Sequence, residues 1–187
     1  MLSNIFWIVC ILWVASEILL LILRRSDKKS QDKDLGSVKR LNFVIYISIA
    51  AGIYISLTKF GNIDFNHHTI LLSGFILIVL GLVVRWIAIL TLRKYFTVNV
   101  AIQKDHVIIQ KGFYKYIRHP SYLGMLLSFL GLGLSLGNFI SIVVIIIPIT
   151  FVLINRIQIE EQALRDVFGN DYQKYCGETW RLIPGIY

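Results

Sequence analysis

Residues 112–122, with the sequence GFYKYIRHPSY, stand where the chain enters a long apolar stretch. Proline is tolerated at the start of a helix, and the residue before it is pushed towards an extended conformation. Arg118 and His119 are therefore expected at the start of that helix, facing whatever the loop encloses. The alternative is an interfacial belt, in which arginine and tyrosine side chains only anchor the end of a membrane helix.

Two adjacent acids, Glu160 and Glu161, follow the last apolar stretch of the chain. Arg156 precedes them by about one helical turn, and an arginine and a glutamate at this spacing commonly form a solvated pair on a helix. The functional alternative is a carboxylate that holds an ammonium or sulfonium group of a ligand near the membrane surface. The residues alone leave both interpretations open.

A single arginine, Arg85, lies inside another apolar stretch. Ionisable side chains within a membrane are costly, and they usually face a cavity or a partner. Snorkelling of the side chain to the interface is the alternative. On the opposite side of the predicted membrane, His67 and His68 have only Asp64 nearby as a further metal ligand, so we expect no metal site.

The composition decides the class of protein in which these residues stand. The chain has 187 residues, of which 56% are hydrophobic and only 16% charged, and its mean hydropathy is +0.69. A soluble domain of this length cannot bury so much apolar surface. The net charge of +8 could indicate nucleic acid. The basic residues gather between apolar stretches, however, as in membrane proteins, so no nucleic-acid partner is expected.

Five apolar stretches are predicted to be membrane helices, which makes the chain an all-α integral membrane protein. They are residues 5–23, 41–57, 69–92, 122–136 and 139–155. The last two are joined only by Gly137 and Asn138, which predicts an antiparallel hairpin. The fourth is short, so it is expected to tilt or to begin in the headgroup region. We expect one domain over 1–187, with a two-helix region at 1–68 and a catalytic core at 69–187.

Basic residues alternate between the connections and so predict the orientation. They are abundant in 24–40, 93–118 and the tail, whereas 58–68 holds only Lys59. By the positive-inside rule the N-terminus faces outside, and the long polar segments and the C-terminus face the cytoplasm.

Two smaller elements are expected on this cytoplasmic side. The segments 98–103 and 106–110 are predicted to form a small hairpin. Residues 156–168 are predicted to form an amphipathic helix that ends at Gly169.

An ordered set of motifs resembles the isoprenylcysteine carboxyl methyltransferase family. The set is RHPSYLG at 118–124, the acidic pair Glu160-Glu161, FGNDY at 168–172 and RLIP at 181–184. The similarity covers roughly 81–187. The Arg-His-Pro-x-Tyr stretch and the acidic pair also occur in phospholipid and thiol methyltransferases, and NADPH-dependent membrane sterol reductases resemble the stretch too. The ordered set is more specific than any one of its members.

The resemblance implies an enzyme that uses S-adenosyl-L-methionine, held by the cytoplasmic loop and tail, while a lipophilic or lipidated substrate enters from the membrane lipids. The carboxylate of an isoprenylcysteine-like compound is the first expectation for the acceptor. A phospholipid amine, a small thiol or a hydroxyl group stays open, as does a membrane reductase. By matched position, the cofactor-binding residues would be Gly112, Tyr114, Arg118, His119, Pro120, Tyr122, Glu160 and Glu161. The catalytic residues would be Arg85, Arg156 and Glu161.

Physical chemistry is compatible with this implication. Methyl transfer from a sulfonium is an in-line displacement that needs positioning and a desolvated site more than a strong base. A carboxylate is already ionised at neutral pH, so an arginine can orient it with two hydrogen bonds and no proton transfer.

Overall fold

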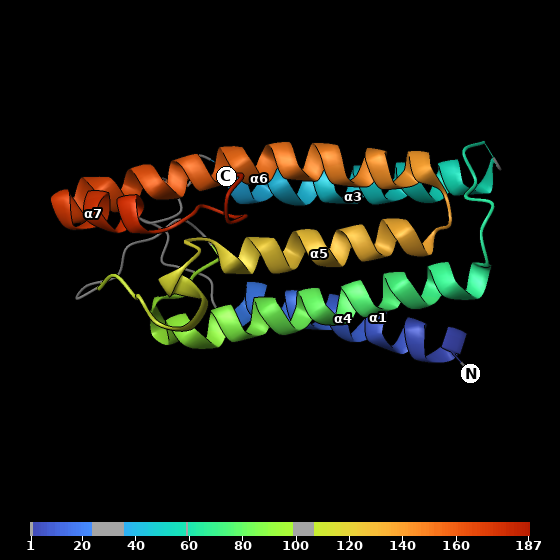
Figure 1. Ribbon diagram of the computed structural model, residues 1–187, viewed down its shortest axis with the longest axis horizontal. Helices are drawn as coiled ribbons and strands as arrows, with labels where there is room; N and C mark the ends of the chain where they lie inside the picture. The colour runs from blue at the N-terminus through green and yellow to red at the C-terminus, as the bar shows by residue number, and fades with distance from the viewer. Residues whose placement is uncertain (1, 24–35, 59, 99–106) are drawn as a thin grey trace.

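The computed structural model describes residues 2–23, 36–58, 60–98 and 107–187, and in these ranges it contains helices but no strand. Five long helices run along one axis (Figure 1). They are α1 (Leu2–Leu23), α3 (Ser37–Leu57), α4 (His67–Leu92), α5 (Pro120–Ser135) and α6 (Phe139–Phe168). Three short helices complete the described chain: η2 (Arg93–Tyr95), η3 (Gly112–Lys115) and α7 (Asn170–Glu178).

The predicted class, an all-α integral membrane protein, is confirmed. Four helices, α1, α3, α4 and α6, are long and apolar enough to cross a membrane. Helix α5 has 16 residues. A helix of that length is about 24 Å long, less than the roughly 30 Å of a hydrocarbon core. Its shortness agrees with the sequence, while the total of five spans stays a prediction.

Helices α4 and α5 pack closely because glycines face each other between them. A Cβ atom added to Gly81 would lie 2.5 Å from the Gly124 carbonyl oxygen, and one added to Gly131 would lie 2.5 Å from that of Gly74. Small residues at such positions let helix backbones approach each other within a membrane. This approach brings Arg85 of α4 to the first turn of α5.

Helix α6 packs against α3 and carries the centre of the core. Ile145, Ile149 and Leu153 are fully buried along one of its faces. The Ser141 hydroxyl donates a hydrogen bond of 2.7 Å to the carbonyl oxygen of Gly52 on α3. These contacts fix the direction of α6, whose later turns carry Arg156 and the acidic pair.

The two ends of the bundle differ. The segment 107–119, η3 and α7 gather at one end, whereas the connection after α3 and the turn between α5 and α6 lie at the other (Figure 1). At that second end, the side-chain amide of Asn138 donates to the Phe60 carbonyl oxygen at 2.8 Å and accepts from the Ser141 backbone N–H at 3.1 Å. The connections with few basic residues therefore share one end of the molecule.

The structure adds to two expectations about the cytoplasmic side. Residues 156–168 are helical as predicted, and they continue α6, which runs without a break from Phe139 to Phe168. Arg156 is buried rather than solvated. The end at Gly169, which has a φ of +52°, is confirmed. The predicted hairpin lies mostly in 99–106, outside the described residues, and 107–110 form no strand.

Candidate functional site

The segment before α5 is held in place by the last residues of the chain. The Arg118 and His119 backbone N–H groups donate to the carbonyl oxygens of Trp180 and Arg181, at 2.8 and 3.0 Å. The Trp180 N–H donates back to Tyr116 at 2.9 Å, which makes a short parallel pairing. Pro120 then begins the helix, as predicted. The loop and the tail thus form one unit over the end of the bundle.

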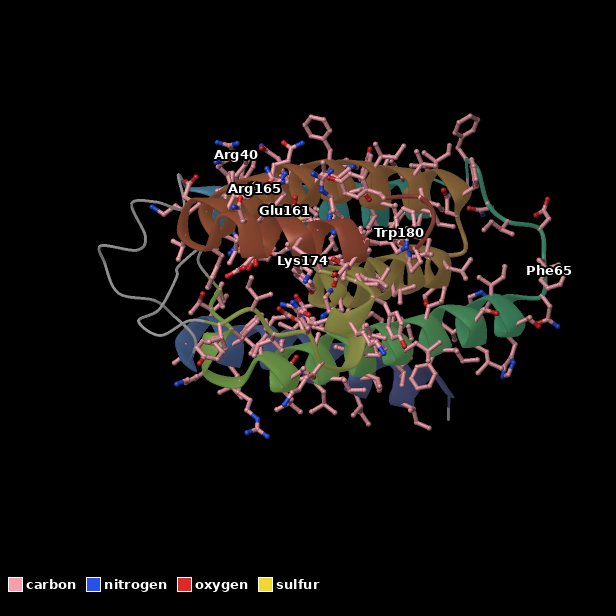
Figure 2. All side chains as sticks on the ribbon, turned by 60° about the vertical axis from the view of Figure 1, so that its left-hand side comes forward. Arg40, Phe65, Glu161, Arg165, Lys174 and Trp180 are labelled. Carbon is pink, nitrogen blue, oxygen red and sulfur yellow. The ribbon has the colours of Figure 1, made fainter. Side chains whose placement is uncertain are left out.

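Glu161 joins this unit to α6. Its side chain is 1% exposed, and its two oxygens accept hydrogen bonds from three arginines. Arg118 donates through Nε at 2.9 Å, Arg165 at 2.9 Å and Arg181 through Nε at 3.0 Å. Figure 2 shows Glu161 and Arg165 together near one end of the bundle, far from Phe65. Three segments distant in the sequence therefore meet on one buried carboxylate.

Two of these arginines are fixed further. The Arg118 guanidinium also donates to the carbonyl oxygen of Cys176 at 3.1 Å and to both oxygens of Thr179. Burial alone would lower the pKa of Arg181, but the negative charge of Glu161 raises it. Arg181 therefore stays charged and forms an ion pair with Glu161.

A cavity opens beside this cluster, between the loop, α6 and α7. Its empty volume is about 890 Å³, including its open mouth. Five of the predicted cofactor-binding residues line it: Tyr114, Arg118, His119, Tyr122 and Glu160. The other three, Gly112, Pro120 and Glu161, do not line it. Gly112, the first residue of η3, has a φ of +58°, a conformation that favours glycine.

The two members of the acidic pair have different environments. The Glu160 side chain is 34% exposed and faces the cavity, where it accepts a hydrogen bond of 2.8 Å from the Tyr122 hydroxyl. His119 Nδ1 lies 3.8 Å from the same carboxylate oxygen. Successive helix residues point about 100° apart, so one acid can face the cavity while its neighbour is buried.

Two buried polar atoms of the cavity wall have no hydrogen-bond partner in the described structure. They are the Tyr172 hydroxyl and His119 Nε2, which lies 3.5 Å from Glu161 Oε1 without forming a hydrogen bond to it. Burial raises the pKa of the Tyr172 phenol above its usual value, so the phenol stays neutral. Buried polar groups are normally satisfied, and an unsatisfied one calls for a ligand or water. Together with Glu160, these atoms offer a ligand one negative charge and two hydrogen-bonding positions.

A second cavity lies among the membrane helices and has mainly apolar walls. Its empty volume is about 1420 Å³, including its mouth, and its walls come mainly from α1, α3 and α5. Four residues line both cavities: Phe96, Thr97, Tyr122 and Arg156. The apolar cavity in the bundle thus adjoins the cavity at its end, which has more polar groups in its walls and is called the polar cavity below.

Arg156 occupies the boundary between the two cavities. It is buried, and its Nε donates a hydrogen bond of 2.9 Å to the Tyr122 hydroxyl, which in turn donates to Glu160. Its other nitrogens donate to the Ser37 hydroxyl at 2.5 Å and to the Val98 carbonyl oxygen. Arg156 therefore has a fixed position where the two spaces meet.

Arg85 faces the membrane cavity and is paired inside it. Its Nε and one terminal nitrogen donate to the two carboxylate oxygens of Glu17 on α1, each at 2.6 Å. Another nitrogen donates to the Ser121 carbonyl oxygen at 3.3 Å. Of the two alternatives that the sequence left open, the structure shows a cavity and a partner rather than snorkelling.

Comparison with known proteins decides the family. The model of the isoprenylcysteine carboxyl methyltransferase (ICMT) family matches residues 74–166. This chain belongs to the ICMT family. The matched region contains Arg85, the segment before α5, Arg156 and the acidic pair.

Proteins named as isoprenylcysteine methyltransferases are similar over about 60% of the chain. The protein-S-isoprenylcysteine O-methyltransferase of Dictyostelium discoideum is 37% identical over 116 residues, which are 61% of this chain and 49% of that protein. The enzyme of that name from Saccharomyces cerevisiae is 36% identical over 60% of this chain and 48% of its own length. The chain thus spans about half the length of these relatives.

A solved structure of the family shows the same fold. The eukaryotic intramembrane Ras methyltransferase ICMT superposes with a TM-score of 0.69 at 24% identity. The superposition covers 99% of this chain and 67% of the other. The arrangement of α1 and α3, which lie outside the matched region, is therefore part of the shared fold.

Two residues of the cavities were missed at the level of sequence. Tyr172 stands in the FGNDY run that supports membership of the ICMT family, so its position could have been inferred. Glu17 is the one acid of the first apolar stretch, as Arg85 is the one base of the third. Both residues stand near the helix ends that lie towards the polar loops. Their similar depth in the predicted membrane was the feature of the sequence that could have indicated the pair.

Proposed function

We propose that this protein is a membrane-embedded methyltransferase that uses S-adenosyl-L-methionine. The proposed acceptor is the carboxylate of a lipophilic, isoprenylcysteine-like substrate. The observation that carries the proposal is the contact between the two cavities, which share Phe96, Thr97, Tyr122 and Arg156. A polar cofactor and an apolar substrate can meet at that boundary and nowhere deeper in either cavity. The names of the relatives support the same acceptor.

The polar cavity fits the cofactor by its chemistry. Its carboxylate, Glu160, can pair with a positive group, and the unsatisfied His119 Nε2 and Tyr172 hydroxyl can bind polar atoms. When bound, the cofactor supplies a methyl group activated by a sulfonium. Glu161 has a different role in this proposal. It touches Arg118 and not the cavity, so it is a positioning residue for the loop.

The apolar cavity fits an isoprenoid chain. Trp13, Phe129 and Leu132 are among its walls, and such walls bind hydrocarbon without specific hydrogen bonds. Among the described residues, Arg85 and Arg156 are the cations that line it. An arginine can orient a carboxylate with two hydrogen bonds. Because a carboxylate is ionised at neutral pH, no residue has to remove a proton from it. The chain's own task is to position the acceptor and to exclude water.

We further propose that the polar end of the bundle faces the cytoplasm, because the basic connections lie there. The test uses a background in which Cys10 and Cys176 are replaced by serine. A cysteine at Asn66 should then be labelled from outside intact cells by an impermeant maleimide, and one at Gln173 should not. The opposite labelling would place the polar cavity away from the cytosolic cofactor.

The main experiment is binding and transfer with the purified full chain in detergent. S-adenosylhomocysteine should bind in calorimetry and NADPH should not. The protein should then transfer a labelled methyl group to an S-prenylcysteine but not to its carboxamide. Binding of NADPH in place of S-adenosylhomocysteine, or transfer to the carboxamide, would refute the proposal.

A further inference from the structure

The ion pair of Glu17 and Arg85 raises a question that the proposed function does not answer. Its two hydrogen bonds, both 2.6 Å, use the side of the guanidinium that a carboxylate binds with two oxygens. Arg85 is 7% exposed and Glu17 is 31% exposed, and both line the apolar cavity. The protein thus places a carboxylate of its own where a substrate carboxylate would be oriented.

Arg156, which also lines the cavity, offers an incoming carboxylate no alternative binding position. The three guanidinium nitrogens of Arg156 donate to Tyr122, Ser37 and Val98. An incoming carboxylate therefore has to displace an existing partner before it can bind either arginine through two hydrogen bonds. Glu17 is the displaceable one, because it is a flexible side chain that is one-third open to the cavity.

The displacement has a cost that depends on the incoming molecule. When one carboxylate replaces another on Arg85, the cavity gains one negative charge without a partner, and such a charge is expensive in an apolar surrounding. A molecule that fills the cavity can offset this cost by apolar contact. A fatty acid of the bilayer has the same carboxylate, so it incurs the same cost.

We propose that Glu17 is a specificity-determining residue that competes with apolar carboxylates for Arg85 and so excludes the fatty acids of the bilayer from the site. The inference rests on the proposed function only in taking the cavity as the substrate site. Glu17 acts through Arg85 and does not take part in methyl transfer.

The test compares Glu17→Gln with the wild type by calorimetry, using palmitate and its neutral analogue palmitamide. Removal of the competing charge should tighten palmitate binding at least tenfold, about 1.4 kcal/mol, while palmitamide binding stays the same. The KM for an S-prenylcysteine should fall and kcat should stay constant. Ser16→Ala is the matched control, because this hydroxyl lies one residue away and bonds only its own helix, at Trp13. It should change none of these values.

If palmitate binds Glu17→Gln no better than wild type, or more weakly, Glu17 supports Arg85 instead of competing with it, and the inference is wrong. If Glu17→Gln does not fold, the double variant Glu17→Gln, Arg85→Gln leaves no unpaired charge. It should bind palmitate and palmitamide equally, and a remaining preference for palmitate would overturn the inference. Failure of S-adenosylhomocysteine to bind the wild type would refute the proposed function alone, because the palmitate comparison needs no cofactor.

Discussion

Two carboxylates in this protein bind arginine, and their surroundings are opposite. Glu161, at the polar end, accepts from three arginines and is 1% exposed. Glu17, among the membrane helices, accepts from one arginine and is 31% exposed. The first carboxylate faces packed protein, and the second faces a cavity.

The difference separates a structural contact from a replaceable one. A carboxylate with three charged donors from three segments cannot leave without freeing all of them, so Glu161 keeps the loop, α6 and the tail together. A carboxylate with one donor and open space beside it can be exchanged for another. The number of donors and the access to the site, rather than depth in the membrane, therefore indicate which ion pair a ligand can enter.

The largest expected effect is on stability, from Glu161→Gln. Removal of one member of a buried ionic cluster typically costs about 3–5 kcal/mol. For a chain of this size that lowers the unfolding midpoint by roughly 6–20 °C. Thermal unfolding in detergent measures it. An unchanged midpoint would show that the three arginines find other partners, and the contrast between the two carboxylates would then be lost.

The next effect is on transfer, from Arg85→Lys. Lysine keeps the charge but loses the planar pair of donors that orients a carboxylate. We expect kcat/KM for an S-prenylcysteine to fall about 10- to 100-fold, or about 1.4–2.7 kcal/mol. The affinity for S-adenosylhomocysteine should not change, because Arg85 lines only the apolar cavity. Full activity in this variant would make Arg85 a structural residue and a neutral acceptor the better proposal.

Glu160→Gln should have a smaller effect, which is confined to the affinity for the cofactor. Its carboxylate faces the cavity but is one-third exposed, so water weakens its interactions. We expect the affinity for S-adenosylhomocysteine to fall by about 1–2 kcal/mol, roughly 5- to 30-fold. The unfolding midpoint should stay close to that of the wild type, in contrast to Glu161→Gln. Equal effects of the two variants on stability would show that the acidic pair acts as one structural unit.

The sequence predicted the class of protein and five of the residues that line the polar cavity, for two physical reasons. Membrane helices are long apolar runs, and these are visible in any sequence. The segment before α5 owes its position to Pro120, a local feature. Arg118 and His119 could be placed at a helix start on that basis alone.

What the sequence could not predict depends on contacts between distant segments. Glu160 and Glu161 have separate roles because Glu161, and not Glu160, contacts Arg118 and Arg181. From helical spacing alone, both glutamates would be expected on solvent-exposed faces of the helix. The burial of Arg156 could not be predicted for the same reason, because its guanidinium donates to Tyr122 and to other residues far away in the sequence. The partner of Arg85 was hidden because α1 carries no motif of the family.

The smallest effect tests whether the polar cavity is built for a ligand. The Tyr172 hydroxyl is buried without a hydrogen-bond partner in the described structure, so its removal in Tyr172→Phe should leave the protein as stable or slightly more stable. If a ligand supplies the missing partner, affinity for S-adenosylhomocysteine should at the same time fall by about 0.5–1.5 kcal/mol, roughly two- to tenfold. Thermal unfolding and calorimetry on one preparation measure both quantities.

Tyr175→Phe is the matched control for this last variant. The Tyr175 hydroxyl already donates to the Tyr114 carbonyl oxygen at 2.7 Å, so its removal leaves that oxygen unsatisfied and should lower stability. The two tyrosines stand one helical turn apart on α7 and differ in this one hydrogen bond. A loss of stability in Tyr172→Phe as large as in Tyr175→Phe would mean that the Tyr172 hydroxyl has a partner within the protein. The polar cavity would then lose one of its two open positions, and His119 Nε2 would remain as the other.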